Sequence, residues 1–282
     1  MRTLALLALA CLAPAMAACG DDDDGSQFED GHGGAGPGSG AAGGDDSSAA
    51  GFVGSGGAGN GSGPGSGSGA DNSGFCGSTF TGTVRDFQAS HPDFEFLVEV
   101  DPGIVEDTLG ADGKPVYAGQ AGNPTTNGQE AFDQWYRDVD GINMAQPLPI
   151  TLTEGAGGVF TYDNGDFFPI DGQGFGNEGN AHNYHFTYEL RAQFLYQGGE
   201  VFSFTGDDDL FTFVNGHLAI DLGGVHGAMS QQIDLDAQAA ALGIEPGHVY
   251  PLDFFFAERH TTESNFRIDT TISFTDCGEV PD

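Results

Sequence analysis

The sequence predicts an all-β fold, an antiparallel sandwich or barrel with one or two short helices. Three observations lead to this prediction. After residue 75, about eight or more short segments alternate apolar with polar residues or are rich in β-branched and aromatic side chains. Turn-forming residues separate these segments roughly every dozen positions. Helical spacing of apolar residues is clear in one segment only, which is too little helix for a mixed fold.

Residues 1–18 have the pattern of a secretory signal: a charged start, an apolar run and a small-residue exit. The run is too short for a permanent transmembrane helix. It ends in Ala-Ala-Cys19-Gly, which resembles a bacterial lipoprotein signal with Cys19 as the lipidated residue. Plain cleavage after an alanine is the alternative, because Met16 stands where that motif usually has Leu. We expect an exported protein of the bacterial cell envelope that is lipid-anchored, and surface-exposed or secreted.

Residues 19–74 consist almost entirely of Gly, Ser, Ala and Asp. So few apolar side chains cannot form a core, so we expect a disordered tether. A chain of this composition and length would span roughly 40 Å. The folded domain is predicted at 75–282.

The first elements of this domain are two strands at 79–87 and 94–100, bounded by Gly and Pro. At 127–140 the apolar residues change to helical spacing, and Asn127 with Glu130 matches a capping box, so we predict a helix there. The periodicity places Trp135 on its buried face, in the core. A sugar-stacking platform is the alternative role for this side chain.

The next elements are again β. Segments 159–163 and 166–170 flank Asn164-Gly165, which predicts a hairpin. The Gly-rich loop at 172–183 contains a formal dinucleotide-binding pattern, but it lacks the strand-to-helix context and we treat the match as chance. Strands are predicted at 183–196 and 200–205.

The central feature of the chain is a second predicted hairpin at 205–226. Its turn is Asn215-Gly216, a pair that supplies the two positive φ angles of a type I′ turn. A short helix at 236–242, ended by Gly243, and strands at 249–257 and 265–275 complete the chain.

Three carboxylates, Asp207, Asp208 and Asp209, stand where the first strand of this hairpin begins. Like charges at the mouth of an apolar hairpin are unfavourable unless solvent or a cation compensates them. Ca²⁺ is the natural candidate, because it prefers six to eight oxygen ligands.

The overall charge excludes one class of partner. Seven Lys and Arg face 42 Asp and Glu, for a net charge of -35. Nucleic acids and anionic membranes need clustered cations, so we expect no nucleic-acid binding, and membrane contact by the lipid anchor only.

Four cysteines remain to be assigned. Cys11 leaves with the signal and Cys19 carries lipid, so Cys76 and Cys277 are left as a pair at the two ends of the folded region. In an exported chain they are expected to form a disulfide. Two free buried thiols are the alternative.

Several motifs together resemble one known family. Asp207-Asp208 followed by Asn215-Gly216 and Asp221 resembles the PA14 domain. The longer sequence motifs at 205–226 and 254–267 are similar to its fibro-slime branch. The likeness extends back to residue 79 through Val84-Arg-Asp-Phe, Phe132-Asp-Gln-Trp-Tyr-Arg-Asp and Asn180-Ala-His-Asn-Tyr-His-Phe. It implies a β-sandwich. In sugar-binding PA14 members a cis-linked aspartate pair and a later asparagine hold Ca²⁺, which grips vicinal sugar hydroxyls.

Transferred to this sequence, the resemblance implies Asp207 and Asp208 as metal ligands, with Asn265 as the later asparagine. Nearby ligand-binding candidates are Asp209, Glu258, His226 and His260, of which the two histidines would pin the acidic loops. Zinc is disfavoured, because the histidine spacings match no zinc motif. Carboxylates with a purely structural role are the alternative.

We therefore expect a non-catalytic, surface-anchored module that binds an extracellular or cell-envelope glycan, with Ca²⁺ as cofactor. A structural or matrix-protein-binding component without sugar binding is the second hypothesis. An unrecognised polysaccharide hydrolase is the third, although no nucleophile elbow, phosphate loop or zinc-protease helix occurs in the folded part.

Overall fold

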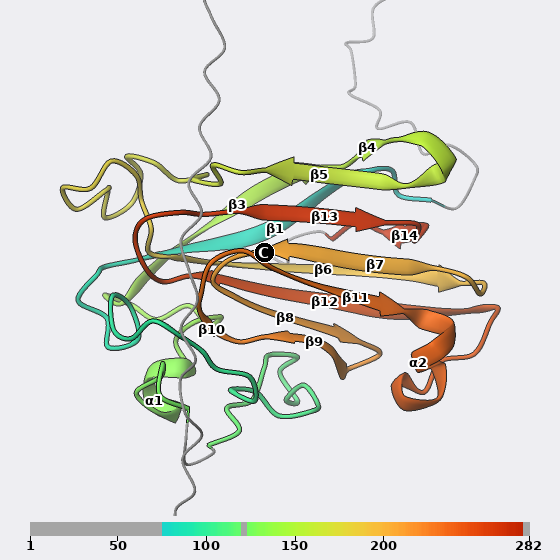
Figure 1. The fold of residues 1–282 in the computed structure, drawn as a ribbon, viewed down its shortest axis with the longest axis horizontal. Coiled ribbons are helices and arrows are strands. Elements are labelled where there is room, and N and C mark those ends of the chain that lie inside the picture. Colours follow the sequence, from blue (N-terminus) through green and yellow to red (C-terminus); the bar gives the residue numbers. More distant parts are fainter. Residues whose placement is uncertain (1–74, 120–122, 279–282) are drawn as a thin grey trace, which may run out of the picture. The chain divides into compact units, whose positions relative to one another are not determined.

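The computed structural model describes residues 75–119 and 123–278, so the predicted signal at 1–18, the lipidation site at Cys19 and the tether at 19–74 lie outside the described residues. Antiparallel sheets packed on one another form this part, which confirms the predicted fold class (Figure 1). Its helices are α1 (Gln129–Phe132), the 3₁₀ turn η1 (Ala156–Gly158) and α2 (Leu235–Leu242). None of the helices among the described residues has the length and apolar character needed to cross a membrane.

The strands form three antiparallel groups. In spatial order the larger sheet contains β3 (Asn143–Thr151), β1 (Thr79–Phe87), β6 (Phe186–Tyr196), β12 (His248–Glu258), β8 (Asp209–Val214) and β9 (His217–Leu222), with β14 (Phe274–Asp276) also paired to β6. The second sheet contains β11 (Met229–Asp234), β7 (Val201–Gly206), β13 (Phe266–Thr270), β5 (Phe160–Asn164) and β4 (Thr153–Glu154). A separate pair is made by β10 (Gly224–Val225) and β2 (Glu99–Val100).

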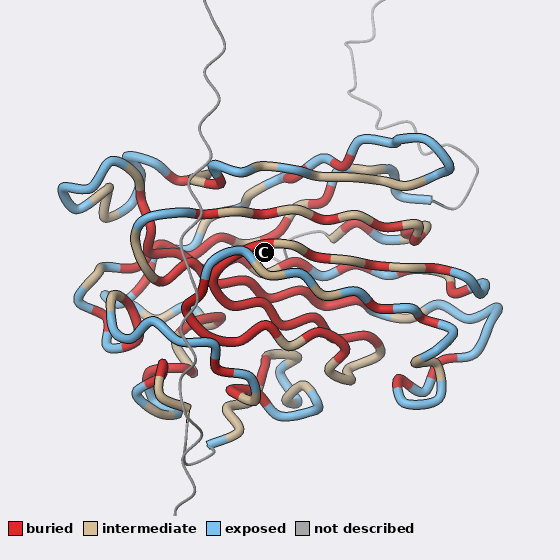
Figure 2. Tube along the Cα trace, viewed as in Figure 1, coloured by how far each residue is buried: buried red, intermediate tan, exposed pale blue. Residues whose placement is uncertain are grey.

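The larger sheet is covered on both faces in its middle, where β8 is buried throughout and β12 is buried from Leu252 to Glu258 (Figure 2). Phe254 and Phe256 of β12 point into the core between the two sheets. Phe255 and Ala257, one residue out of phase, point into a second core on the opposite face, which the segment 101–142 supplies. Burial on both faces explains why this strand reads as a continuous apolar run.

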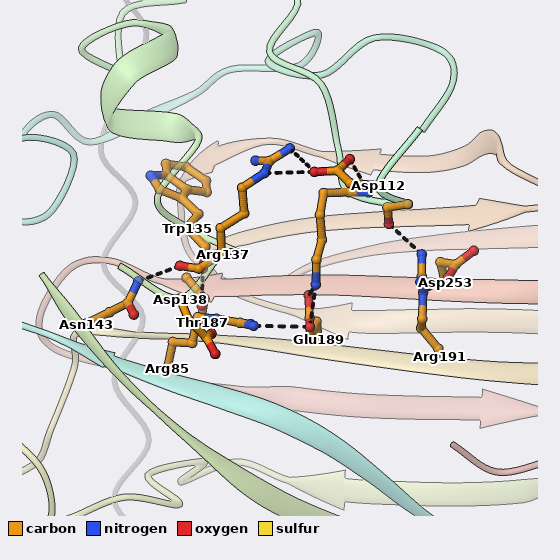
Figure 3. Close-up of polar contacts among 12 residues, drawn as sticks. Arg85, Asp112, Trp135, Arg137, Asp138, Asn143, Thr187, Glu189, Arg191 and Asp253 are labelled. Carbon is orange, nitrogen blue, oxygen red and sulfur yellow. Dashed lines mark hydrogen bonds and ion pairs between the residues drawn. The ribbon is translucent and has the colours of Figure 1, made fainter. Parts of the chain in front are cut away.

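Ion pairs fasten the segment 101–142 to the sheet (Figure 3). Lys114 Nζ donates to Glu189 Oε1 at 2.6 Å, and Arg85 Nη2 reaches the same carboxylate at 3.3 Å. Arg191 Nη2 donates to the Gly113 carbonyl at 2.6 Å. Four of the chain's seven Lys and Arg residues, Arg85, Lys114, Arg137 and Arg191, are used in this region.

The helix predicted at 127–140 is wrong in extent, because α1 ends at Phe132 and turns follow. The predicted capping box is not formed. The Asn127 side chain donates to Asp93 Oδ1 at 3.2 Å, and the indole Nε1 of Trp135 donates to Asp93 Oδ2 at 3.0 Å. These long-range bonds to one carboxylate outweigh the local helical preference. The placement of Trp135 in the core is confirmed, since its side chain is fully buried.

The hairpin predicted around Asn164-Gly165 is also wrong. β5 ends at Asn164, whose side-chain Oδ1 accepts a hydrogen bond from the Asp166 N–H at 3.0 Å. This turn leads into a loop, and β5 pairs with β4 and β13 instead. The strand predicted at 94–100 is reduced to β2.

Strands β3 and β11 were not predicted. Pro147 and Pro149 lie in β3, and proline normally argues against a strand. Here β3 is the edge strand of its sheet and pairs with β1 on one side only. An edge strand forms no ladder hydrogen bonds on its open side, so proline is tolerated there although it has no N–H.

Three local predictions are confirmed. Asn215 and Gly216 have φ angles of 52° and 76° and connect β8 to β9. Gly243 ends α2 in the left-handed conformation. Cys76 and Cys277 form the expected disulfide, which joins the segment before β1 to the segment after β14.

Candidate functional site

Asp207 and Asp208 lie in the turn between β7 and β8, at the end of the sandwich where β5, β7 and β12 finish (Figure 1). A cis peptide bond joins them. Asn265, just before β13, lies beside them: its N–H donates to Asp207 Oδ1 at 2.5 Å and its Nδ2 to Asp207 Oδ2 at 2.9 Å. The fold therefore brings together the three residues that the sequence predicts as metal ligands.

This close approach depends on Gly206, the last residue of β7. At this point β7 pairs with the start of β13. A Cβ atom on Gly206 would lie 2.3 Å from the carbonyl oxygen of Asn265. Only glycine allows the two backbones to come this near, and so allows Asn265 to reach Asp207.

Asp208 is 5% exposed, and backbone donors hold both of its oxygens. His226 N–H donates to Oδ1 at 3.2 Å and Arg259 N–H to Oδ2 at 3.0 Å. Burial raises the pKa of Asp208 to about 8; Arg259 lowers it, while the neighbouring charges of Asp209 and Asp207 add to the increase. In the absence of a cation, this carboxyl therefore resists ionisation.

Asp209 follows directly but is used differently. Its carboxylate is fully buried, and it accepts from the Gly224 N–H at 2.6 Å and from the guanidinium of Arg259. It does not line the pocket next to Asp207 and Asp208. The buried arginine forms an ion pair with this one member of the triplet, and the other two carboxylates form no ion pair with a side chain within the described residues.

Glu258, at the end of β12, adds a further buried acid to this region. Its side chain is completely buried, and neither carboxylate oxygen has a hydrogen-bond partner of ordinary geometry among the described residues, although Ser264 lies nearby. Burial raises the pKa of Glu258 well above its usual value, and the charge of Asp208 raises it further. An unpartnered buried carboxyl is unusual, and its raised pKa means that Glu258 favours the neutral, protonated form.

A pocket of about 200 Å³ opens beside the aspartate pair. Its walls come from the β7–β8 turn, the segment after β10, the loop between β12 and β13, and the segment before β2. The lining residues are Val98, Asp207, Asp208, Val225, His226, Gly227, His260, Thr261, Thr262 and Glu263.

The two histidines predicted at the site both line this pocket. His226 is held by its own backbone surroundings, with Nδ1 3.0 Å from the Gly227 carbonyl oxygen. His260 Nε2 lies 3.4 Å from Glu95 Oε2, and the other oxygen of Glu95 accepts from the Thr261 N–H at 3.0 Å. His260 therefore helps to fasten the loop after β12 to the segment before β2.

Glu95, Arg259 and the run 96–100, apolar except for Glu99, are site residues that the sequence motifs do not predict. Phe96, Val98 and Val100 are each at least half exposed, and Val98 lines the pocket. The run was interpreted as a strand because its composition is that of a strand. Arg259 could have been found, since it is a single cation between Glu258 and His260 in a chain with very few cations.

The donor chemistry of this region fits Ca²⁺. Asp207 and Asp208 offer hard oxygen ligands whose acceptor capacity is only partly used, and the buried carboxyl oxygens of Glu258 have no hydrogen-bond partner of ordinary geometry among the described residues. Among the described residues, no three His, Cys, Asp or Glu side chains converge as a preformed metal centre. The remaining ligands would therefore have to be the Asn265 amide, backbone carbonyls, water or a bound hydroxyl compound.

Comparison with known proteins adds the family. The PA14 domain matches residues 175–280, a span that contains the aspartate pair, both pocket histidines and Asn265. Protein psiR of Dictyostelium discoideum is 40% identical over 202 residues, which cover 65% of this chain and 20% of psiR. Protein psiD of the same organism is 39% identical over 212 residues, or 69% of this chain and 41% of psiD. The chain thus spans less than half the length of these relatives.

Among solved structures, a PA14 sugar-binding domain from an RTX adhesin aligns with 42% of this chain and 73% of its own length, at 13% identity and a TM-score of 0.27.

Proposed function

This chain carries a PA14 domain, and we propose on that basis that it is a non-catalytic module that binds glycans with the help of Ca²⁺ at Asp207, Asp208 and Asn265. The observation that carries the proposal is the division of the acidic triplet. A buried arginine pairs with Asp209, while Asp207 and Asp208 line an open pocket and form no ion pair among the described residues. A divalent cation would supply the missing positive charge.

The protein's own residues would prepare this site before any ligand arrives. Backbone N–H groups of His226, Arg259 and Asn265 orient the two carboxylates, and the pairing of β7 with β13 keeps Asn265 in contact with Asp207. Bound Ca²⁺ would coordinate neighbouring sugar hydroxyls in its remaining positions. Thr261, Thr262 and Glu263, which also line the pocket, would then form hydrogen bonds with the same sugar.

We propose binding without turnover because of how the acids are arranged. A glycosidase places two carboxyl groups on opposite sides of the bond that it cleaves. Asp207 and Asp208 are consecutive residues in one turn, and backbone donors engage both. Their arrangement suits a cation ligand better than an acid and base pair.

The proposed location is outside the cell or on its surface. The disulfide between Cys76 and Cys277 supports it, because such bonds persist in oxidising compartments. The lipoprotein-like start of the sequence leads us to propose a lipid anchor at Cys19.

A matrix-protein partner is the second candidate function, and one observation favours it. Four of the large exposed apolar residues, Phe96, Leu97, Val98 and Val100, lie in one short stretch of sequence, of which Val98 lines the pocket. A contiguous exposed apolar patch is typical of a protein-binding surface.

The experiment that tests the proposal combines calorimetry with a glycan array. Protein freed of metal with a chelator is titrated with CaCl₂, and fluorescent protein is applied to the array with Ca²⁺ or with chelator. We expect calcium binding, and array signals that chelator abolishes. Asp208→Asn should lose both, whereas Asp140→Asn, which changes an exposed aspartate in the same way, should keep both. Absence of calcium binding in the unmodified protein, or glycan signals that survive chelation, would overturn the proposal.

A further inference from the structure

A second hollow of about 490 Å³ lies across the loop 261–265 from the pocket beside Asp207 and Asp208, which is called the calcium-site pocket from here on. Thr262 and Glu263 line both hollows, and Asn265 lines the second while it hydrogen-bonds to Asp207 in the first. The other lining residues are Gly165, Asp166, Phe168, Ala181, His182 and Tyr184. The two hollows are therefore neighbours that share one wall.

One side of the second hollow is aromatic. The rings of Phe168 and His182 are parallel, with an interplanar angle of 9° and centroids 4.0 Å apart. Tyr184 meets both rings edge-on, at 5.1 Å from Phe168 and 6.1 Å from His182. The His182 side chain is 41% exposed, so this aromatic wall is accessible from solvent.

The aromatic wall is held in place from behind. Asp171 Oδ2 lies 2.6 Å from His182 Nδ1, and its Oδ1 accepts from the Asn183 N–H at 2.7 Å. A single carboxylate thus fixes both the ring and the backbone that carries it. A flat side chain that is fixed before binding loses little entropy when it contacts a ligand.

The rest of the lining is polar and includes Asp166, Thr262, Glu263 and Asn265. An aromatic ring in one hollow with carboxylate and amide groups matches a sugar ring, because the C–H face of a pyranose packs on an aromatic ring while its hydroxyls donate to carboxylates. The carboxylates also disfavour anionic ligands such as phosphates or uronic acids. The chemistry therefore selects a neutral sugar.

We infer that this second hollow is a subsite for the next sugar unit of a neutral oligosaccharide whose first unit occupies the calcium-site pocket. The inference rests on the proposed function and deepens it. The ligand is an oligosaccharide rather than a single sugar, because the two hollows share Thr262 and Glu263 as one wall, so neighbouring units of one chain would occupy them. His182 provides the packing surface: Phe168 stacks on one face of its ring, and the exposed part of the ring is left for the sugar. Asn265 lines the second hollow and reaches the first through its hydrogen bond to Asp207.

The test uses an array on which glucose, galactose, mannose and N-acetylglucosamine are each printed as the monosaccharide and as linear di- and trisaccharides, probed in CaCl₂. We expect the bound sugar series to show about tenfold tighter binding of the disaccharide than of the monosaccharide, the equivalent of one aromatic contact. His182→Ala should remove this difference while leaving monosaccharide binding unchanged. His182→Phe should restore it, because the flat ring is retained. His248→Ala, an exposed histidine on the far strand end, is the matched control.

A second readout does not depend on affinity. The ring-proton NMR signals of His182, assigned by their loss in His182→Ala, should shift when the disaccharide is added and stay in place with the monosaccharide. Equal binding of mono- and disaccharides, or an unchanged ratio in a folded His182→Ala variant, would overturn the subsite while leaving the calcium-site proposal intact. An array with no signal from any sugar, for protein that is folded and loaded with calcium, would instead overturn the proposed function, and the subsite with it.

Discussion

Arg259 donates two hydrogen bonds to Asp209, from Nε to Oδ2 at 2.6 Å and from Nη2 to Oδ1 at 3.1 Å, and both side chains are completely buried. The same guanidinium donates to the carbonyl oxygens of Asp93 and Thr125, and it stacks over the Trp135 ring at 4.7 Å. One cation therefore ties the larger sheet to the segment that covers it. It also leaves the two aspartates before Asp209 available for another partner.

Replacement of this arginine should destabilise the protein strongly. In Arg259→Gln the buried carboxylate of Asp209 loses its countercharge, and loss of one partner of a buried pair costs about 3–5 kcal/mol. Urea unfolding at neutral pH measures the change. Arg267→Gln is the matched control: Arg267 pairs with Asp163 and Asp269 at the surface, where such pairs contribute less than about 1 kcal/mol. Similar losses in both variants would contradict the structural role assigned to Arg259.

In the calcium-free protein, the contribution of Asp208 to the free energy of unfolding should fall as the pH rises from about 4 to about 8. Between these values the unfolded chain has released the proton of Asp208, while the folded protein, where burial raises the pKa to about 8, retains it. Unfolding then releases a proton, so a higher pH favours the unfolded state, by at most about 1.4 kcal/mol per pH unit for one group.

The measurement is the free energy of unfolding in chelator at several pH values, for the unmodified protein and for Asp208→Asn. The difference between the two curves isolates this residue from the other acids. We expect the unmodified protein to have the steeper downward slope. Parallel curves would show that Asp208 ionises normally in the folded state.

Calcium should raise the melting temperature at neutral pH. A ligand present at 100 times its dissociation constant stabilises by about 2.7 kcal/mol, and each kcal/mol corresponds to about 2–4 °C in a domain of this size. Asp208→Asn should not respond, and Asn265→Ala should respond less, because it removes one proposed oxygen ligand. Differential scanning calorimetry with CaCl₂ and with MgCl₂ provides the comparison. An equal response of Asp208→Asn and the unmodified protein would place any bound calcium elsewhere.

Gly206→Ala should disturb the site without changing any proposed ligand. The new Cβ would meet the Asn265 carbonyl oxygen, so β7 and β13 must separate there, at a cost of about 1–3 kcal/mol. Calcium affinity should fall as Asn265 moves away from Asp207. Gly227→Ala is the control within the same pocket, because a Cβ there meets no atom within 4 Å. If both variants bound calcium normally, the contact between Asn265 and Asp207 would not matter for the metal.

Loss of the disulfide should lower stability without altering the site. The double variant Cys76→Ser/Cys277→Ser releases a loop that spans 201 residues in sequence, and loss of a native disulfide costs about 2–5 kcal/mol. Chemical unfolding gives the magnitude, and calcium titration of the folded variant gives the control. Reduced calcium affinity in the folded variant would show that the disulfide end and the site are coupled.

How far the sequence predicts this protein depends on the range of each interaction. The alternation at 186–196, the turn at Asn215-Gly216 and the end of α2 at Gly243 were all predicted, because each depends on residues within a few positions. The pairing of Cys76 with Cys277 was also predicted, because an exported chain had no other cysteines left.

The sequence alone determined an all-β body, its disulfide, and an acidic triplet at the mouth of its central hairpin. The tertiary structure alone decided that the triplet divides, with Asp209 bound to Arg259 and the preceding pair facing a pocket beside Asn265. It also cut short the predicted helix, because Asp93 bonds to Trp135 from far along the chain. The physical reason is the same in each case: periodicity reports on neighbours in sequence, whereas burial and charge pairing depend on which distant strands pack together.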